Sequence, residues 1–306
     1  MAHPFRQDLV APAPPPRLTS PPLARSDTTE VAATLRRTTI GVFDSGVGGL
    51  TVLKALLEVV ADADYLYFGD TARLPYGSKS VETVSKYATQ AARYLEHHHA
   101  QVLVIACNTA TALALDAITQ AARVPVIGVV EPGAEQAALQ SRNRKAVVLG
   151  TEATVASHAY LKALASRGIE AREKACPLLV PLVEEGWVDD PVSEQVSRIY
   201  LNEAFSAGYE SADILLLGCT HYPLLKPLLG RVAPRHVTII DSAQSTAQAV
   251  AKELAKVAPR DPALVERRHA PRLKFFATDS ADKFRCLGTR FLGRTIEDVV
   301  HVDLRE

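Results

Sequence analysis

Two cysteines in this sequence stand in matching surroundings that could carry chemistry. Cys107 lies in ACNTAT and Cys219 lies in GCTHYP, and an apolar run precedes each of them. Polar residues and the start of an expected helix follow each cysteine. Because the N–H groups at a helix N-terminus favour a thiolate, the sequence predicts two thiols with lowered pKa values. Without such help a thiol with a pKa of about 8.5 is only about 3% ionised at pH 7.

The spacing of the cysteines disfavours several familiar cysteine sites. The chain has four cysteines in 306 residues and no C-x-x-C, so neither a disulfide framework nor a clustered zinc site is expected. A phosphatase loop of the form C-x5-R is absent, since Leu113 and Leu225 stand where the arginine would be. A Cys–His hydrolase would use only one of the two matched cysteines, and it stays open as an alternative.

Two matched thiols suit one task particularly well. One thiol can remove a proton from a carbon on one face while the other delivers a proton to the opposite face, which inverts the stereocentre. The reverse reaction uses the same groups with exchanged roles, so such a site should be nearly symmetric. Reacting atoms lie about 3–3.5 Å apart, so we expect the two sulfurs at roughly 6–7 Å from each other.

Other polar residues near these segments have both a structural and a functional interpretation. Asp44 opens a glycine-rich loop, where it can cap the following helix. The backbone N–H groups of such a loop can hold a carboxylate. The loop fails the dinucleotide pattern at Thr51, so NAD is not expected. His221, two residues after Cys219, is predicted to handle protons. Residues 97–99 are three histidines that a helix would spread over its surface by about 100° each, so no metal site is expected there.

The remaining two cysteines lack these surroundings. Cys176 and Cys286 are each interpreted as a small apolar side chain that is simply buried.

Composition excludes several classes of protein. The 34 basic and 34 acidic residues give a net charge of zero, which argues against a nucleic-acid partner. Hydrophobic residues make up 47% of the chain, enough for a core. No apolar stretch is long enough to span a bilayer, and prolines interrupt any signal sequence at the N-terminus. The sparse cysteines favour a reduced, cytoplasmic protein without membrane contact.

The chain alternates short apolar runs with longer helical patterns. Apolar runs that do not alternate with polar residues are typical of strands buried on both faces. The expected strands are 39–43, 65–68, 102–106, 125–129, 145–149, 214–218, 237–240 and 273–277. The expected helices are 48–60, 80–99, 109–123, 153–167, 191–207 and 243–257. Such alternation predicts an α/β fold with parallel sheets flanked by helices.

A weak internal repeat divides the chain into two similar halves. VLVIACNT at 102–109 resembles ILLLGCTH at 214–221, and a strand–loop–helix start precedes each of them. The pattern predicts that each half offers one cysteine from the carboxyl end of a strand, the edge where ligands bind in open α/β sheets.

Eight segments together resemble the glutamate racemases, members of the cofactor-independent aspartate/glutamate racemase family. They are GVFDSGVGGLTVL (41–53), YFGDTARLPYGSKS (67–80), ACNTAT (106–111), GVVEPGA (128–134), VLGTEATVAS (148–157), CPLLVPLVEEG (176–186), LLGCTHYPLL (216–225) and IDSA (240–243). Aspartate-specific relatives typically carry Glu at the position of His221, so the resemblance favours glutamate as the substrate.

The resemblance implies a role for each matching site residue. It implies that Cys107 and Cys219 are the catalytic bases, that no cofactor or metal is needed, and that Asp44, Glu184 and His221 assist proton transfer. The substrate-binding residues that it implies are Asp44, Ser45, Tyr76, Gly77, Asn108, Thr109, Thr220 and His221. It further implies D-glutamate supply for peptidoglycan, and a chain that can form a homodimer.

The resemblance also implies two pseudo-symmetric α/β domains with the active site in the cleft between them. The first domain would comprise 39–130 together with 240–306, and the second 131–239. Residues 1–38, rich in proline, are expected to form a disordered tail. An aspartate or hydantoin racemase is the nearest alternative function, and a non-catalytic amino-acid-binding protein is an alternative of a different class.

Overall fold

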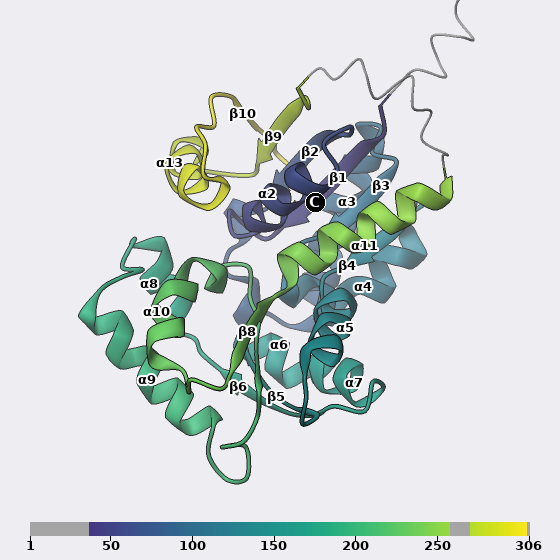
Figure 1. The fold of residues 1–306 in the computed structure, drawn as a ribbon. Coiled ribbons are helices and arrows are strands. Elements are labelled where there is room, and N and C mark those ends of the chain that lie inside the picture. The colour runs from purple at the N-terminus through teal and green to yellow at the C-terminus, as the bar shows by residue number, and fades with distance from the viewer. Residues whose placement is uncertain (1–36, 258–269, 305–306) are drawn as a thin grey trace, which may run out of the picture. The chain divides into compact units, whose positions relative to one another are not determined.

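Two parallel sheets organise the computed structural model, which describes residues 37–257 and 270–304 (Figure 1). The first sheet has the order β10-β9-β2-β1-β3-β4 and the second the order β6-β5-β7-β8. The strands of the first sheet are β1 (Thr39–Asp44), β2 (Asp64–Gly69), β3 (Val102–Ile105), β4 (Val126–Gly128), β9 (Leu273–Ala277) and β10 (Val299–His301). Those of the second are β5 (Lys145–Gly150), β6 (Glu170–Ala175), β7 (Ile214–Gly218) and β8 (Thr238–Asp241).

The two sheets repeat one topology. The order β2-β1-β3-β4 in the first sheet corresponds to β6-β5-β7-β8 in the second, and every pairing is parallel. The strands β3 and β7, which precede the two cysteines, therefore hold equivalent places. The predicted class, α/β with two pseudo-symmetric parallel sheets, is confirmed.

Helices cover both faces of each sheet. Helices α2 (Leu50–Val59), α11 (Ser242–Val257) and α13 (Ala281–Leu292) pack on one face of the first sheet, and α3 (Val81–His97) and α4 (Asn108–Ala121) pack on the other. Helices α8 (Leu179–Glu184), α9 (Pro191–Ala204) and α10 (Lys226–Val232) pack on one face of the second sheet. Helices α5 (Val130–Gln140) and α7 (Ala159–Ala165) pack on its other face. The short helix α6 (Glu152–Ser157) begins just after β5.

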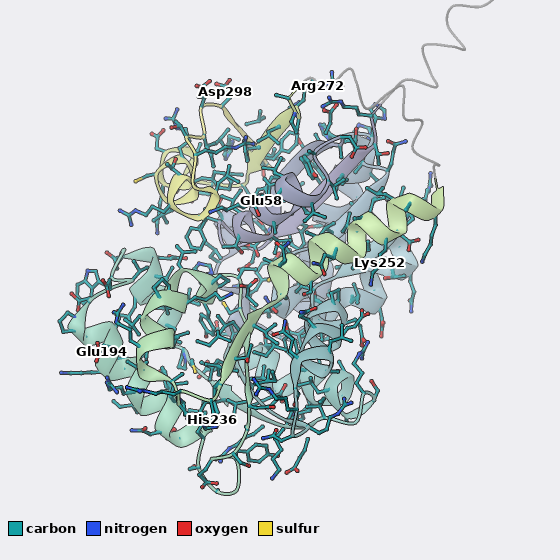
Figure 2. The ribbon with its side chains drawn as sticks, in the orientation of Figure 1. Glu58, Glu194, His236, Lys252, Arg272 and Asp298 are labelled. Carbon is teal, nitrogen blue, oxygen red and sulfur yellow. The ribbon has the colours of Figure 1, made fainter. Side chains whose placement is uncertain are left out.

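Side chains cap several of the helices, and these helices expose charged residues on their outer faces. Ser80 caps α3 by accepting a hydrogen bond of 3.3 Å from the N–H of Thr83, and Asp190 caps α9 in the same way. The exposed Glu58 on α2 and Lys252 on α11 are labelled in Figure 2. The apolar faces of the same helices build the core, in which burial of each large side chain stabilises the fold by about 1.5–3 kcal/mol.

Three predictions about elements need correction. The expected helix at 153–167 is broken into α6 and α7 at His158, whose φ of 55° is left-handed. The strand β6, with the sequence EAREKA, was not expected, because an edge strand with exposed charges lacks the apolar run that identified the others. The elements α5, α8, α10, α13 and β10 were also not expected.

The domain boundaries at 131 and 240 stay a prediction, although the second sheet takes all its strands from residues 145–241. Most of the expected tail, residues 1–36, lies outside the described residues. The described part of the chain contains no helix that is long and apolar enough to cross a membrane.

Candidate active site

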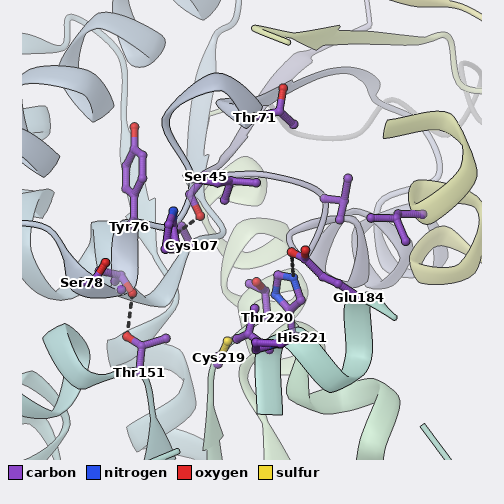
Figure 3. Close-up of a pocket in the computed structure, with 18 of the residues that line it drawn as sticks. Ser45, Thr71, Tyr76, Ser78, Cys107, Thr151, Glu184, Cys219, Thr220 and His221 are labelled. Carbon is purple, nitrogen blue, oxygen red and sulfur yellow. Dashed lines mark hydrogen bonds and ion pairs between the residues drawn. The ribbon is translucent and has the colours of Figure 1, made fainter. Parts of the chain in front are cut away.

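A cavity of about 580 Å³ lies at the carboxyl ends of the strands and takes its walls from both halves of the chain (Figure 3). The loop after β1, residues 71–78 and the start of α4 contribute the wall of the first sheet. The start of α6, the residues after β6 together with α8, and the loop after β7 contribute the wall of the second sheet. Both Cys107 and Cys219 line this one cavity, so the structure brings together the two thiols that the repeat singled out.

Cys107 caps the N-terminus of α4. Its Sγ accepts a hydrogen bond from the N–H of Ala110 at 3.4 Å and lies 3.5 Å from the Oγ of Ser45 (Figure 3). Burial and, to a smaller extent, the charge of Asp44 raise the pKa of this thiol to about 12, and the hydrogen bonds oppose this rise only in part. The predicted lowering of its pKa is therefore wrong, because desolvation outweighs the helix N-terminus.

Cys219 has a different neighbour, the imidazole of His221. The Nε2 of His221 lies 3.2 Å from Oε1 of Glu184 (Figure 3). The imidazole also interacts with the side chain of Cys219. Burial alone would lower the pKa of His221, but the bonds to Cys219 and Glu184 and the charges of Cys219 and Asp44 raise it to about 10. The hydrogen bond from His221 in turn lowers the pKa of Glu184. At neutral pH the imidazolium places a positive charge beside Cys219.

Asp44 lies behind the cavity wall. It is fully buried and is not among the lining residues. Its carboxylate accepts hydrogen bonds from the N–H of Gly46 at 2.9 Å and from the Oγ1 of Thr220 at 3.4 Å. Burial raises its pKa, although the nearby charge of His221 opposes the shift. Asp44 therefore has no direct contact with the cavity, and its hydrogen bond to Thr220 connects it to a residue that lines the cavity.

Asn108 and Thr109 line the cavity at the start of α4. Oδ1 of Asn108 accepts a hydrogen bond of 2.6 Å from Tyr160, whereas its buried Nδ2 has no hydrogen-bond partner among the described residues. The hydroxyl of Thr109 lies 2.9 Å from that of Thr151 and 3.2 Å from that of Thr154, across the two halves. A free amide donor and a group of hydroxyls suit the binding of a carboxylate.

Tyr76 and Gly77 form part of the wall opposite the second sheet. The hydroxyl of Tyr76 donates a hydrogen bond of 2.5 Å to Oδ2 of the buried Asp70. A Cβ at Gly77 would lie 2.9 Å from Cβ of Thr151, so the absence of a side chain allows the two halves to approach closely here.

Several lining residues were not expected from the sequence. Thr151, Lys283 and Asp279 come from segments far from the cysteine motifs. Cys176 is buried, as expected, but it also lines the cavity. The sequence did not indicate that Cys176 lies at a strand end, because β6, the strand before it, was not recognised.

The interpretation of Cys286 was wrong, because this residue is exposed and not buried. His97 and His99 are exposed, in agreement with the expected surface position. The three histidines do not all lie on one helix, however, since α3 ends at His97 and His99 has a left-handed φ of 69°. His98 is half-buried and stacks on Tyr94 with ring centroids 4.2 Å apart. Within residues 37–257 and 270–304, no group of three His, Cys, Asp or Glu side chains could hold a metal ion.

Comparison with known proteins agrees with this geometry. Residues 40–250 match the family model described as Asp/Glu/Hydantoin racemase. The glutamate racemase of Koribacter versatilis is 55% identical over 288 residues, which cover 88% of this chain and 98% of the relative. The crystal structure of a glutamate racemase isoform from Bacillus anthracis is 36% identical with a TM-score of 0.80, covering 87% of this chain and 98% of that one.

A third relative was solved with a ligand. The glutamate racemase of Francisella tularensis in complex with D-glutamate is 34% identical with a TM-score of 0.78, and the match covers 88% of this chain and 98% of that one. This chain belongs to the Asp/Glu/Hydantoin racemase family and is by class an amino-acid racemase. The resemblance to the glutamate racemases that the motifs indicated is thereby confirmed.

Proposed function

We propose that this racemase interconverts L- and D-glutamate by proton transfer at the α-carbon between two thiols, Cys107 and Cys219. One observation carries the proposal: two cysteines from topologically equivalent strands line a single cavity. The names of the relatives support glutamate as the substrate, and one of them was solved with D-glutamate bound. His221, two residues after Cys219, also favours glutamate, because aspartate-specific relatives typically carry Glu at this position.

The proton balance of the step is simple. A thiolate on one face takes the α-proton, so an S–H bond forms as the Cα–H bond breaks and the electron pair stays on the substrate. The thiol on the other face then gives its proton to the carbon. No oxidant or reductant is consumed, and the reverse reaction starts from the exchanged protonation states.

The two thiols have different surroundings before substrate binds. The raised pKa of Cys107 keeps it protonated at neutral pH, which suits a proton donor. The imidazolium of His221 faces Cys219, which suits a base that must carry negative charge. We therefore assign Cys219 as the base and Cys107 as the acid of the resting site. The opposite enantiomer requires the proton to be redistributed first.

The α-proton of an amino acid is a weak acid, so the site must stabilise the carbanion. A turnover near 10 per second corresponds to a barrier of about 16 kcal/mol. Hydrogen bonds to the α-carboxylate spread the developing charge, and they are strongest where water is excluded. The Nδ2 of Asn108 and the hydroxyls of Thr109, Thr151 and Thr220 are the candidate donors, because all four residues line the cavity.

The remaining implied roles follow from these positions. Glu184 acts through its contact with His221, and Asp44 acts through Thr220. Ser45, Tyr76 and Gly77 shape the substrate wall of the first sheet. The product D-glutamate would serve peptidoglycan synthesis in the cytoplasm.

Circular dichroism of the purified protein with L-glutamate, and separately with D-glutamate, tests the proposed function. We expect each signal to decay to zero without added cofactor. Faster decay with aspartate or a hydantoin would identify a different racemase. Binding of glutamate without any loss of optical activity would indicate a binding protein, and a trapped acyl-enzyme would indicate a Cys–His hydrolase.

A further inference from the structure

One buried tyrosine outside the cavity contacts the chain beside both cysteines. Tyr160 on α7 is fully buried and is not among the residues that line the cavity. Its hydroxyl donates a hydrogen bond to Asn108, the residue after Cys107. Its ring packs against Gly218, the residue before Cys219, where a Cβ would lie 2.9 Å from the ring atom Cε2. Tyr160 thus spans the distance between the two strand ends.

The hydrogen bond from Tyr160 fixes the orientation of the amide of Asn108, a residue that lines the cavity. An asparagine side chain has one oxygen acceptor and one NH₂ donor, and a half-turn about its last bond exchanges them. The phenol holds Oδ1 at 2.6 Å, which leaves the buried Nδ2 without a protein partner among the described residues. Ser242 also hydrogen-bonds with the phenol and supports this arrangement.

The structure around Tyr160 leaves room for this ring and its hydroxyl. A Cβ at Gly133 on α5 would lie 3.6 Å from the phenol oxygen, and Gly218 is tighter still. A carboxylate in the cavity would need a donor, and the orphaned Nδ2 is such a donor. A flipped amide would instead present an oxygen to the carboxylate and repel it.

We propose that Tyr160 is a positioning residue that fixes the Asn108 amide with its NH₂ group toward the substrate carboxylate. The proposal rests on the proposed function, since it takes an amino-acid carboxylate as the ligand. Tyr160 belongs to the second half of the chain and Asn108 to the first. The orientation of the Asn108 NH₂ group therefore depends on the packing of the two halves against each other.

Tyr160→Phe removes the hydroxyl and keeps the ring. We expect kcat/KM for glutamate to fall about tenfold, the loss typical of one hydrogen bond to a charged group, mainly through a higher KM because the bond to the carboxylate already forms in the bound substrate. Tyr65→Phe is the matched control. Tyr65 is equally buried and its hydroxyl donates to the carbonyls of Leu56 and Val60, away from the cavity, so its loss should lower the melting temperature but leave KM unchanged.

A double-mutant cycle separates positioning from a general loss of stability. In the Asn108→Ala background, Tyr160→Phe should raise KM by less than twofold further, because the amide that it orients is gone. An unchanged KM in Tyr160→Phe, or effects of the two substitutions that multiply, would overturn the proposal. If Tyr160→Phe does not fold, Ser242→Ala provides the same test. We expect this variant to raise KM about threefold, and an unchanged KM would overturn the proposal.

Measurements of turnover and of calorimetric glutamate binding on the wild-type protein distinguish a failure of the Tyr160 proposal from a failure of the proposed function. Wild-type protein that racemises glutamate, with a Tyr160→Phe variant that is indistinguishable from it, refutes only the role of Tyr160. Wild-type protein that neither racemises nor binds glutamate refutes the proposed function and this inference with it.

Discussion

Cys107 and Cys219 occupy equivalent strand ends but have different neighbours. Cys107 has a serine hydroxyl and the buried Asp44 nearby, whereas Cys219 has an imidazole that Glu184 keeps protonated. The backbone that places the two thiols is symmetric. The side chains around the two thiols differ, so the charged groups of the site without substrate are distributed unequally.

Replacing either cysteine should remove racemisation. We expect Cys107→Ser and Cys219→Ser each to lower kcat more than a thousandfold, because a serine hydroxyl is a far weaker acid than a thiol. Racemisation rates measured by circular dichroism test this. Cys176→Ala, which removes the third thiol of the cavity wall, and Cys286→Ser on the surface should retain activity. Full activity in either of the first two variants would contradict the two-thiol assignment.

Gly48 shows how closely the loop after β1 approaches the residues after β7. A Cβ there would lie 2.2 Å from Oγ1 of Thr220 and 2.6 Å from Nδ1 of His221, so both side chains would have to shift. We expect Gly48→Ala to lower kcat at least a hundredfold, since His221 would leave Cys219. Gly230→Ala is the control, because nothing lies within 4 Å of a Cβ at that position in α10 and alanine favours a helix. Equal activity of the two variants would show that His221 tolerates displacement.

At the scale of elements, the residues just after β9 hold the segment 71–78, which forms part of the cavity wall. The buried Asp70 follows β2 and accepts hydrogen bonds from Tyr76, from Arg73 at 3.0 Å and from Thr278, just after β9, at 2.9 Å. Next to it, the hydroxyl of Thr71 donates to the carbonyl of Asp279 at 2.6 Å. The residues after β9 thus hold residues 71–78, although they carry no part of the cysteine motifs.

Asp70→Asn should loosen this segment. It removes the charge that pairs with the half-buried Arg73, and we expect a loss of about 3 kcal/mol in the free energy of unfolding together with a higher KM. Urea denaturation and steady-state kinetics measure the two effects. Asp189→Asn breaks the exposed pair with Arg231 and should leave both nearly unchanged. A stable Asp70→Asn variant with normal KM would show that the remaining contacts of residues 71–78 hold this segment without the charge of Asp70.

At the scale of the whole molecule, the hydrogen bonds and charges around the buried His221 make the stability depend on pH. Its pKa is about 10 in the folded state and about 6.5 in the unfolded chain, so folding binds its proton more tightly. This contribution is complete below pH 6.5 and is lost as the pH rises to about 10.

Unfolding measurements at several pH values test this contribution. The free-energy difference between wild type and His221→Gln should be greater at pH 6 than at pH 10, by on the order of 2–4 kcal/mol. Urea denaturation at pH 6, 8 and 10 supplies the values, and the difference between the two proteins cancels the titration of the tyrosines and of Cys107. A difference that does not change with pH would show that His221 is neutral in the folded protein.

The sequence was informative where the chemistry is local, and uninformative where packing decides. The strand ends that carry the cysteines and the adjacent His221 could be predicted, because they lie within a few residues of strongly apolar runs. The contact of Glu184 with His221 joins residues 37 apart, and that of Tyr160 with Asn108 joins residues 52 apart. Neither follows from periodicity. The raised pKa of Cys107 could not be predicted either, because it depends on burial by distant segments.

The most direct test of the two-thiol account is the position of deuterium after partial reaction of L-glutamate in D₂O. Chiral separation and mass spectrometry at low conversion would measure the α-hydrogen of the product and of the recovered substrate. We predict deuterium in the D-glutamate and protium in the recovered L-glutamate, because one thiol takes the proton and the other, exchanged with solvent, supplies its replacement. Deuterium entering both enantiomers at equal rates would mean a single base and would contradict the account.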